Sequence, residues 1–266
     1  MTRRFAYGRK PAVYTARSMR YALAMAAALD PLGPPPDSCR DYLSAVKNSG
    51  PQMFSNDVLS DCVCVDTANT MILRTANASS ATIVPTIDQV LDLYSVFGYV
   101  RGDPSTDNGV GELDMCNYLV STGFLGHRAD ATGNIEPSNL DHVKWSNLLF
   151  GHCRLGLNLP RYAEDQFSNG QPWDVSNSGD PTPGGHDVPL VDFRNGMLYV
   201  YTWGKVQPMT YGAYFAWTEE AHCEVHADWF TQQGPAPSGF DLETLLARMR
   251  EIIMVADAAA ESIGVA

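Results

Sequence analysis

Apolar residues in the first half of the chain recur at the spacing of helices. Residues 62–76 (CVCVDTANTMILRTA) are mostly apolar and predict a buried helix. Residues 86–97 predict an amphipathic helix with Thr86 as its N-cap. Its apolar face would carry Ile87, Val90, Leu91 and Tyr94. Two further helices are expected over residues 112–121 and 137–151.

The second half changes to the two-residue alternation of strands. Residues 153–159 alternate, and so do residues 186–193 and 197–203. Asn195-Gly196 joins the last two runs, and this dipeptide between alternating segments predicts a hairpin. Residues 210–225 predict further aromatic-rich sheet or helix. Helices followed by strands predict an α+β fold, with a helical N-terminal half packed on a β-rich C-terminal half.

Both ends of the chain differ from this central part. The N-terminal arm combines basic residues, a short helix that ends at Pro31, and three consecutive prolines at 34–36 that impose an extended segment. A linker rich in Pro and Gly precedes a last amphipathic helix over residues 240–260. The predicted boundaries are 1–49 for the arm, 50–231 for the main domain, and 232–266 for the linker and C-terminal helix.

The distribution of charge restricts the classes of function. The chain of 266 residues has a net charge of −12, which argues against nucleic-acid binding because that needs a basic surface. The first 21 residues nevertheless hold six basic residues and no acidic one. They are Arg3, Arg4, Arg9, Lys10, Arg17 and Arg20. A basic arm on an acidic body predicts docking to an acidic surface of another protein subunit; the alternative is a disordered, solubilising tail.

Neither membrane insertion nor secretion is expected from the sequence. No apolar run approaches the ~20 residues that span a bilayer, and no clear cleavage site follows residues 21–29. The cysteine spacing suggests no disulfide framework, so reduced thiols are expected. The cysteines are Cys39, Cys62, Cys64, Cys116, Cys153 and Cys223. No cofactor is predicted, because the glutamate of the HCEVH run at 222–226 stands one position too late for a zinc-peptidase helix.

Cys62 is the main candidate for chemistry. It begins the predicted helix after a polar loop, where the helix macrodipole favours the nucleophilic thiolate. His186 follows Gly184-Gly185 at the start of a strand, and a neutral imidazole near a thiol could act as its base. The alternatives are a buried structural cysteine and a structural histidine.

Three further features accompany these two residues. Asn56 stands six positions before Cys62, and the run Tyr201-Thr202-Trp203-Gly204 follows the hairpin. With His186 leading a strand, this order resembles the papain family of cysteine peptidases, over about residues 50–225. The family has an oxyanion-hole amide where Asn56 stands, and Asn-Ser-Trp-Gly where Tyr201–Gly204 stands. Within that superfamily the chain resembles divergent papain-like proteins of bacteriophages and prophages, and the resemblance implies a papain-like fold.

The residue that would orient the imidazole departs from the family pattern. The family's asparagine falls on Tyr201 by alignment with Trp203, and on Thr202 by spacing from the histidine. Thr202 should point away from Tyr201, and its hydroxyl could accept a hydrogen bond from the ring. Cys64 is an alternative nucleophile, but Val58 stands six positions before it and cannot donate to an oxyanion. The predicted catalytic residues are Cys62, His186, Asn56 and Thr202.

Two classes of function follow from the resemblance. The first is a virion-associated structural protein of a capsid or tail, which keeps the Cys/His site and docks to a phage particle through its basic arm. The missing asparagine and the lack of a recognisable pro-segment favour this class. The alternative is an active cysteine peptidase or acyl hydrolase that uses Cys62 and His186 on peptide substrates. The expected location is a virion or the host cytoplasm.

Overall fold

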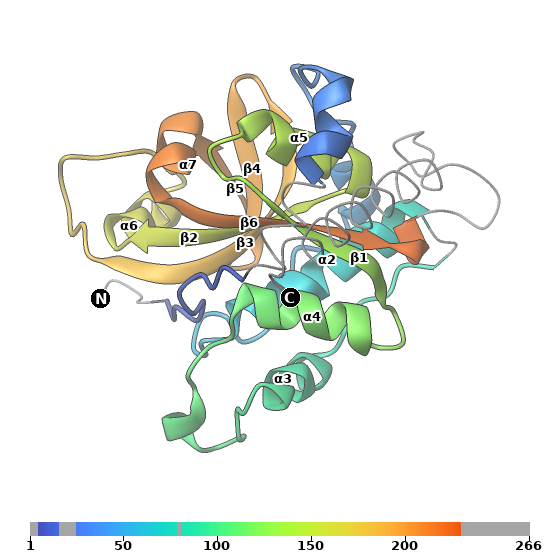
Figure 1. Cartoon of the computed structure of the whole chain (residues 1–266). Helices are drawn as coiled ribbons and strands as arrows, with labels where there is room; N and C mark the ends of the chain where they lie inside the picture. Colours follow the sequence, from blue (N-terminus) through green and yellow to red (C-terminus); the bar gives the residue numbers. More distant parts are fainter. Residues whose placement is uncertain (1–4, 16–24, 79–80, 230–266) are drawn as a thin grey trace, which may run out of the picture.

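A six-stranded sheet lies at the centre of the computed structural model, which describes residues 5–15, 25–78 and 81–229 (Figure 1). The strand order is β1-β6-β2-β3-β4-β5, and every neighbouring pair is antiparallel. The strands are β1 (Ala129–Ile135), β2 (Cys153–Pro160), β3 (Pro183–Arg194), β4 (Met197–Thr202), β5 (Lys205–Thr210) and β6 (Thr218–His226). The three predicted alternating runs correspond to β2, β3 and β4.

Helices cover both faces of this sheet. In Figure 1, α2, α4 and α3 lie below the sheet, whereas α5 and α7 lie above it. The helices are α2 (Cys62–Ala78), α3 (Ile87–Val96), α4 (Glu112–Ser121), α5 (Leu140–Phe150), α6 (Tyr162–Ser168) and α7 (Tyr211–Trp217). Short 3-10 turns lie at Asp30–Leu32, Leu43–Val46, Pro104–Thr106 and Ala227–Trp229. The predicted α+β fold, helical first and β-rich after, is confirmed.

Local sequence explains where elements begin and turn. The Thr86 hydroxyl accepts a hydrogen bond from the Gln89 N–H, and the Gln89 side chain accepts one from the Thr86 N–H, so this pair caps α3. The β3–β4 hairpin turns at Asn195 and Gly196, whose φ angles are 53° and 72°. Asn-Gly favours a turn with two left-handed residues. The predicted cap and hairpin are both confirmed.

Four elements differ from the sequence prediction, and one of them is β5, which lies between the predicted segments 197–203 and 210–225. The pattern does not predict β1, because ADATGNI has few apolar side chains and no regular alternation. It also does not predict α6, which is only seven residues long and therefore shows no helical period. In α3, Ile87 is exposed and Leu93 is buried, so the buried face is rotated from the predicted one.

Two apolar cores lie on opposite sides of the sheet. One packs α5, α6 and α7 on it, and the other packs α2 with α3 and α4. Between α2 and the sheet lies a layer of charged side chains that are almost fully buried. This layer contains Asp66, Arg154, Asp187 and Glu224. The start of α2 is therefore held on the sheet by polar contacts as well as by apolar packing.

Residues 5–15 of the arm pack on the main domain. Arg9 forms a parallel bridge with Val110, and the Lys10 N–H donates to the Val110 carbonyl. Phe5 is buried in the larger apolar core, together with Met25 of the following segment. The predicted linker and helix at 232–266 lie outside the described residues, and the domain boundaries stay a prediction. Among the helices described, none combines the length and the apolar character needed to cross a membrane.

Candidate active site

Cys62 is the first residue of α2. The Asp61 carbonyl accepts hydrogen bonds from the N–H groups of Cys64 and Val65 (2.9 and 3.0 Å), so the helix begins where the sequence predicts. The Cys62 thiol is buried, and backbone groups of Asp187 and Gly8 lie close to it. Cys64 is buried in the core around α2. The thiol of Cys62 thus lies between the sheet and the arm.

His186 lies near the beginning of β3 and is fully buried. Its Nε2 is 2.8 Å from the Thr202 hydroxyl oxygen. In the tautomer protonated at Nε2, this nitrogen donates to Thr202 and leaves a lone pair on Nδ1. Nδ1 is buried and has no hydrogen-bond partner among the residues described. Such a nitrogen is available to accept a proton.

The structure separates the two candidates for the orienting residue. Tyr201 packs in a third apolar cluster, with Tyr42 and Trp229, whereas Thr202 faces the imidazole. Trp203 stacks on the His186 ring, with centroids 4.8 Å apart and planes at 22°. Trp203 has a φ of 43°, which is unfavourable for a bulky side chain, and this strained turn places its indole over the imidazole. Thr202 and Trp203 together fix the ring.

Asn56 lies in the turns before α2 and is almost fully buried. Its backbone N–H donates to the Met53 carbonyl (3.1 Å), and its side-chain oxygen has no hydrogen-bond partner in the described part of the chain. The structure therefore joins His186 to Thr202 and places Cys62 against the backbone of Asp187. It shows no bond from Asn56 to these residues, and the catalytic roles stay predictions.

The arm runs across this site. The backbone of Gly8 lies close to the Cys62 thiol. The Gly8 carbonyl accepts a hydrogen bond from the Val110 N–H (2.9 Å). The Arg9 N–H donates to the carbonyl of Gly185 (2.9 Å), the residue before His186. The Tyr7 ring lies edge-on to the imidazole, with centroids 5.9 Å apart. Three consecutive arm residues therefore cover both halves of the candidate pair.

Three glycines permit this close approach. A Cβ on Gly8 would lie 1.9 Å from the Ser60 carbonyl oxygen. A Cβ on Gly109 would lie 2.0 Å from the carbonyl oxygen of Gly8, and one on Gly185 would lie 2.1 Å from that of Arg9. No side chain fits at such distances, so each position needs glycine for the arm to stay in place.

Burial under the arm keeps the candidate pair neutral. Burial raises the pKa of Cys62 far above its usual range, and the Asp187 carboxylate raises it further. Burial lowers the pKa of His186 to about 3, and the nearby Arg9 guanidinium contributes to this shift. A neutral thiol is a poor nucleophile, because the thiolate is the reactive form. The arm-covered arrangement is therefore chemically unreactive.

A buried ion cluster fixes α2 on the sheet. Arg154 Nη1 lies 2.5 Å from Asp187 Oδ2 and 3.3 Å from Asp66, while Nε lies 2.9 Å from Glu224 Oε1. Arg154 also donates to the Val63 carbonyl (3.2 Å), in the first turn of α2. Breaking a buried network of this kind is costly, because a charge is left unpaired. The cluster holds the start of α2 against β3, the strand that carries the histidine.

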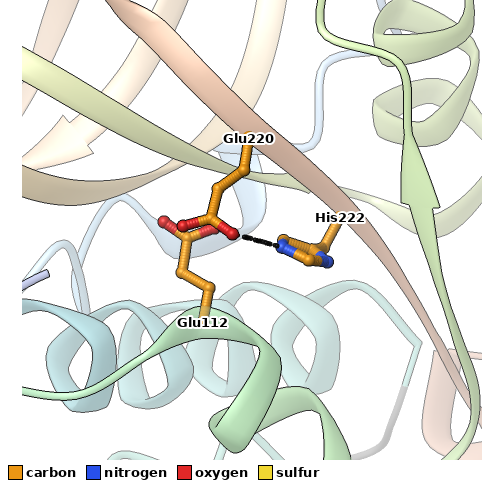
Figure 2. Close-up of side chains that lie close together, drawn as sticks. All are labelled: Glu112, Glu220 and His222. Carbon is orange, nitrogen blue, oxygen red and sulfur yellow. Dashed lines mark hydrogen bonds and ion pairs between the residues drawn. The ribbon is translucent and has the colours of Figure 1, made fainter. Parts of the chain in front are cut away.

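The HCEVH run is a strand, not a helix. Alternate side chains of β6 face the charged layer between the sheet and helices α2 and α4. Cys223, which lies between two of them in the sequence, packs in the apolar core on the opposite face. The inward set is Glu220, His222, Glu224 and His226. Glu220 and His222 meet Glu112 of α4, and the ligand atoms of these three lie within 4.8 Å of one another (Figure 2). The sequence pattern did not predict this acidic group, although the two-residue spacing of its charged members on β6 could have indicated it.

The chain was compared with known proteins through its sequence and its fold. No protein-family model and no curated protein sequence matches it. Several solved structures do. Xylellain, a cysteine protease from Xylella fastidiosa, has 14% identity and a TM-score of 0.60, with 85% of this chain and 97% of that chain covered. The fold is that of the papain-like cysteine proteases.

Two further solved structures share the papain-like fold. One is a Carica candamarcensis cysteine protease in complex with E-64, with 11% identity, a TM-score of 0.50, and 72% and 99% of the two chains covered. The other is procathepsin B from Trypanosoma congolense, with 13% identity, a TM-score of 0.50, and 84% and 86% covered. These likenesses confirm the predicted papain-like fold. None of them indicates a phage or prophage origin.

Proposed function

We propose that this protein is a cysteine peptidase, or a related acyl hydrolase, whose site is covered by its own N-terminal arm. The observation that carries the proposal is that three arm residues lie against the candidate pair on a papain-like fold. Gly8 lies close to Cys62, Tyr7 packs on His186, and Arg9 binds the backbone of Gly185. An extended polypeptide across a thiol and an imidazole supports a peptide as the ligand of this site.

In the proposed reaction, Cys62 transfers its proton to Nδ1 of His186 and attacks a peptide carbonyl as the thiolate. Thr202 holds the ring through Nε2, which keeps Nδ1 available for the proton. The Cys62 backbone N–H and the Asn56 amide stabilise the oxyanion. His186 then protonates the leaving amine, and water attacks the thioester to release the acid and restore the thiol.

The arm would keep this reaction switched off. It fills the space that a substrate backbone needs, and it removes water from the thiol and the imidazole. When residues 7–10 withdraw, hydration returns, and the pKa of His186 rises toward about 6.5 while that of Cys62 falls. The thiolate–imidazolium pair can then form. One structural neighbour is named as a proform, which supports an inhibitory role for the arm.

The virion-associated role has less support than the peptidase. It depends on a basic arm that needs an acidic partner, and Arg9 meets acidic side chains on its own chain, where it lies 2.8 Å from Glu220. The sequence pattern showed no recognisable pro-segment, and this favoured the structural role. The arm covers the candidate site as a pro-segment would, so this argument for the structural role is weaker. Docking to other subunits or to a phage particle stays a prediction that no contact favours.

The test uses a variant in which the arm cannot stay in place. Gly8→Val with Arg9→Ala, called the arm-open variant, puts a β-branched side chain where Ser60 leaves no room. We expect the arm-open variant to hydrolyse members of a mixed peptide library at least about a hundredfold faster than the wild type. Cys62→Ala in the same background should abolish this activity, and E-64 should modify Cys62.

A matched glycine substitution controls for general effects. A Cβ on Gly212 would meet no atom closer than 3.6 Å, so Gly212→Ala should leave the arm in place and the activity low. Thermal unfolding checks that each variant is folded. A folded arm-open variant that cleaves no peptide, and whose Cys62 does not react with E-64, would overturn the proposal.

A further inference from the structure

The Arg9 side chain fills an acidic pocket beside the candidate nucleophile. Nη1 lies 2.8 Å from Glu220 Oε1, and Nη2 lies 2.5 Å from Glu219 Oε2. Nη2 also donates to the side-chain oxygen of Asn158 (2.9 Å) and lies 3.5 Å from the Leu157 carbonyl oxygen. Only 1% of the Arg9 side chain is exposed. With the Lys10 carbonyl, 3.1 Å from Nη1, five acceptors thus surround one buried guanidinium.

A second acidic group lies deeper in the same pocket. Glu112 is 1% exposed, and neither of its carboxylate oxygens has a hydrogen-bond partner among the described residues. It extends from α4 toward Glu220 and His222 of β6 (Figure 2). One of its carboxylate oxygens lies 3.6 Å from His222 Nε2. Burial, and then the neighbouring Asp187 and Glu220, raise the pKa of Glu112 well above its usual range, so this acid can pair with a cation in the pocket by losing its proton.

The pocket exists because its floor is a glycine. A Cβ on Gly156 would lie 2.4 Å from Glu112 Oε1 and 2.8 Å from Arg9 Cδ. Any larger residue at this position of β2 would therefore fill the space that the arginine stem occupies. The depth of the pocket matches a long side chain with a charged end, and Glu219, which is 34% exposed, marks its mouth.

The position of the pocket relates it to the reaction. The backbone of Gly8, next to Arg9 in the chain, lies close to the Cys62 thiol. The backbone groups that hold the arm here are the Gly185 carbonyl and both polar groups of Val110. All of these are main-chain groups, so they can hold any extended peptide in place of the arm. A substrate that replaces the arm would therefore place a side chain of its own in this pocket.

We infer that the pocket of Glu112, Glu219, Glu220 and Asn158 is a specificity pocket that selects an arginine, and less strongly a lysine, close to the scissile bond of a peptide substrate. The inference rests on the proposed function. A guanidinium satisfies several acceptors at once with its planar array of donors, whereas an ammonium is a single point of charge. A leucine would make none of the contacts that the guanidinium makes with Glu219, Glu220 and Asn158, and His222 would be the remaining cationic partner of Glu220.

A divalent metal ion is the other occupant to consider. Glu112, Glu220 and His222 can bring three ligand atoms within 4.8 Å of one another. In the structure, however, a guanidinium nitrogen lies against Glu220, and Asn158 and Glu219 add acceptors that the metal group does not include. The contacts favour arginine, and metal binding becomes an outcome of the test.

The test compares matched fluorogenic peptides that carry Arg, Lys, Leu or Glu at each position near the scissile bond. With the full-length arm-open variant, we expect kcat/KM for the best Arg peptide to exceed that of its Leu counterpart at least about a hundredfold. Lys should fall about tenfold below Arg. Glu220→Gln should lower the Arg-to-Leu ratio at least about thirtyfold, and Glu219→Gln about threefold.

Asp165→Asn removes an exposed acid of α6 and should leave the Arg-to-Leu ratio unchanged. Equal kcat/KM values for the Arg and Leu peptides overturn the inference. They do so whether or not the protein binds Mn²⁺ in a stoichiometric amount when the metal is added alone. If E-64 does not react with Cys62 and no peptide is cleaved, the proposed function fails separately. The pocket is then tested by equilibrium binding of the same peptides to the Cys62→Ser form, where equal affinities for Arg and Leu peptides overturn it.

If the arm-open variant does not fold, a second protein replaces it. This protein carries a protease cleavage site within the exposed residues 13–15 and is cut there after it has folded.

Discussion

The two halves of the arm, before and after Gly8, are held by different forces. Before it, Phe5 stacks on Trp203 with ring centroids 4.2 Å apart, and Tyr7 lies edge-on to the same indole. After it, Arg9 pairs with acidic side chains in a buried pocket. The aromatic half covers the imidazole by apolar contact, which salt leaves unchanged. The charged half depends on ion pairs, which salt weakens, so the two anchors can be released separately.

Gly8→Val should release both halves at once and give the largest effect. A Cβ at 1.9 Å from the Ser60 oxygen excludes the observed path of the backbone. We expect iodoacetamide to modify Cys62 about a thousandfold faster than in the wild type, equal to about 4 kcal/mol of lost arm docking. Mass spectrometry measures the rate. An unchanged rate in a folded protein would show that the arm does not control access.

Phe5→Ala should release the aromatic half. The ring is buried against Trp203 and Phe167, and the loss of such contacts costs about 3 kcal/mol. Cys62 should therefore be modified about a hundredfold faster, with little dependence on salt. Phe215→Ala, at a ring that is 56% exposed, is the matched control and should change nothing. A similar gain in both variants would contradict a specific anchor.

Arg9→Met should release the charged half. It keeps the apolar stem but removes the guanidinium from Glu220, which keeps its contact with His222 but loses its cationic partner on the arm, so we expect modification of Cys62 about thirtyfold faster at low salt. Added salt should speed modification of the wild type about threefold and leave Arg9→Met unaffected. Lys10→Met provides the control, since only its backbone contacts hold the arm. A salt effect of equal size in Arg9→Met would assign the dependence elsewhere.

Acid should weaken docking of the aromatic half. The pKa of His186 is about 3 when the arm covers it and should return to about 6.5 when water reaches the ring. Between these values the uncovered state binds a proton that the covered state excludes, so arm affinity falls as pH falls. In the arm-open variant that also carries Cys62→Ser, where no thiol shares the proton of His186, a labelled peptide of residues 3–12 should bind about tenfold more weakly at pH ~5 than at pH ~6.5. His186→Gln should remove this dependence, and tighter binding in acid would contradict it.

Thr202→Val should have the smallest effect. It removes the hydrogen bond to Nε2 and keeps the side-chain shape, so peptide hydrolysis by the arm-open variant should fall about fivefold. Tyr201→Phe removes a buried hydroxyl without a hydrogen-bond partner in the described chain and should leave hydrolysis unchanged. The reverse ranking would assign the orienting role to Tyr201.

The sequence predicted the elements that carry a strong local pattern. The α3 start after Thr86 and the hairpin at Asn195-Gly196 follow from capping and turn chemistry, which neighbouring residues decide. The path of the arm could not be predicted, because it depends on contacts between residues far apart in the chain, such as Gly8 with Ser60. The acidic pocket joins Arg9 to β6 in the same way. Its glutamates look like solvated charges until the fold buries them.

The rate at which iodoacetamide modifies Cys62 tests the central claim most directly. It is measured by peptide mass spectrometry in the wild type, in the arm-open variant, and in the arm-open variant with His186→Ala. We predict slow modification in the wild type and fast modification in the arm-open variant. His186→Ala should return the rate to that of a free cysteine, because the imidazole no longer takes the thiol proton. A rate in the arm-open variant that matches free cysteine and is unchanged by His186→Ala would contradict a catalytic pair.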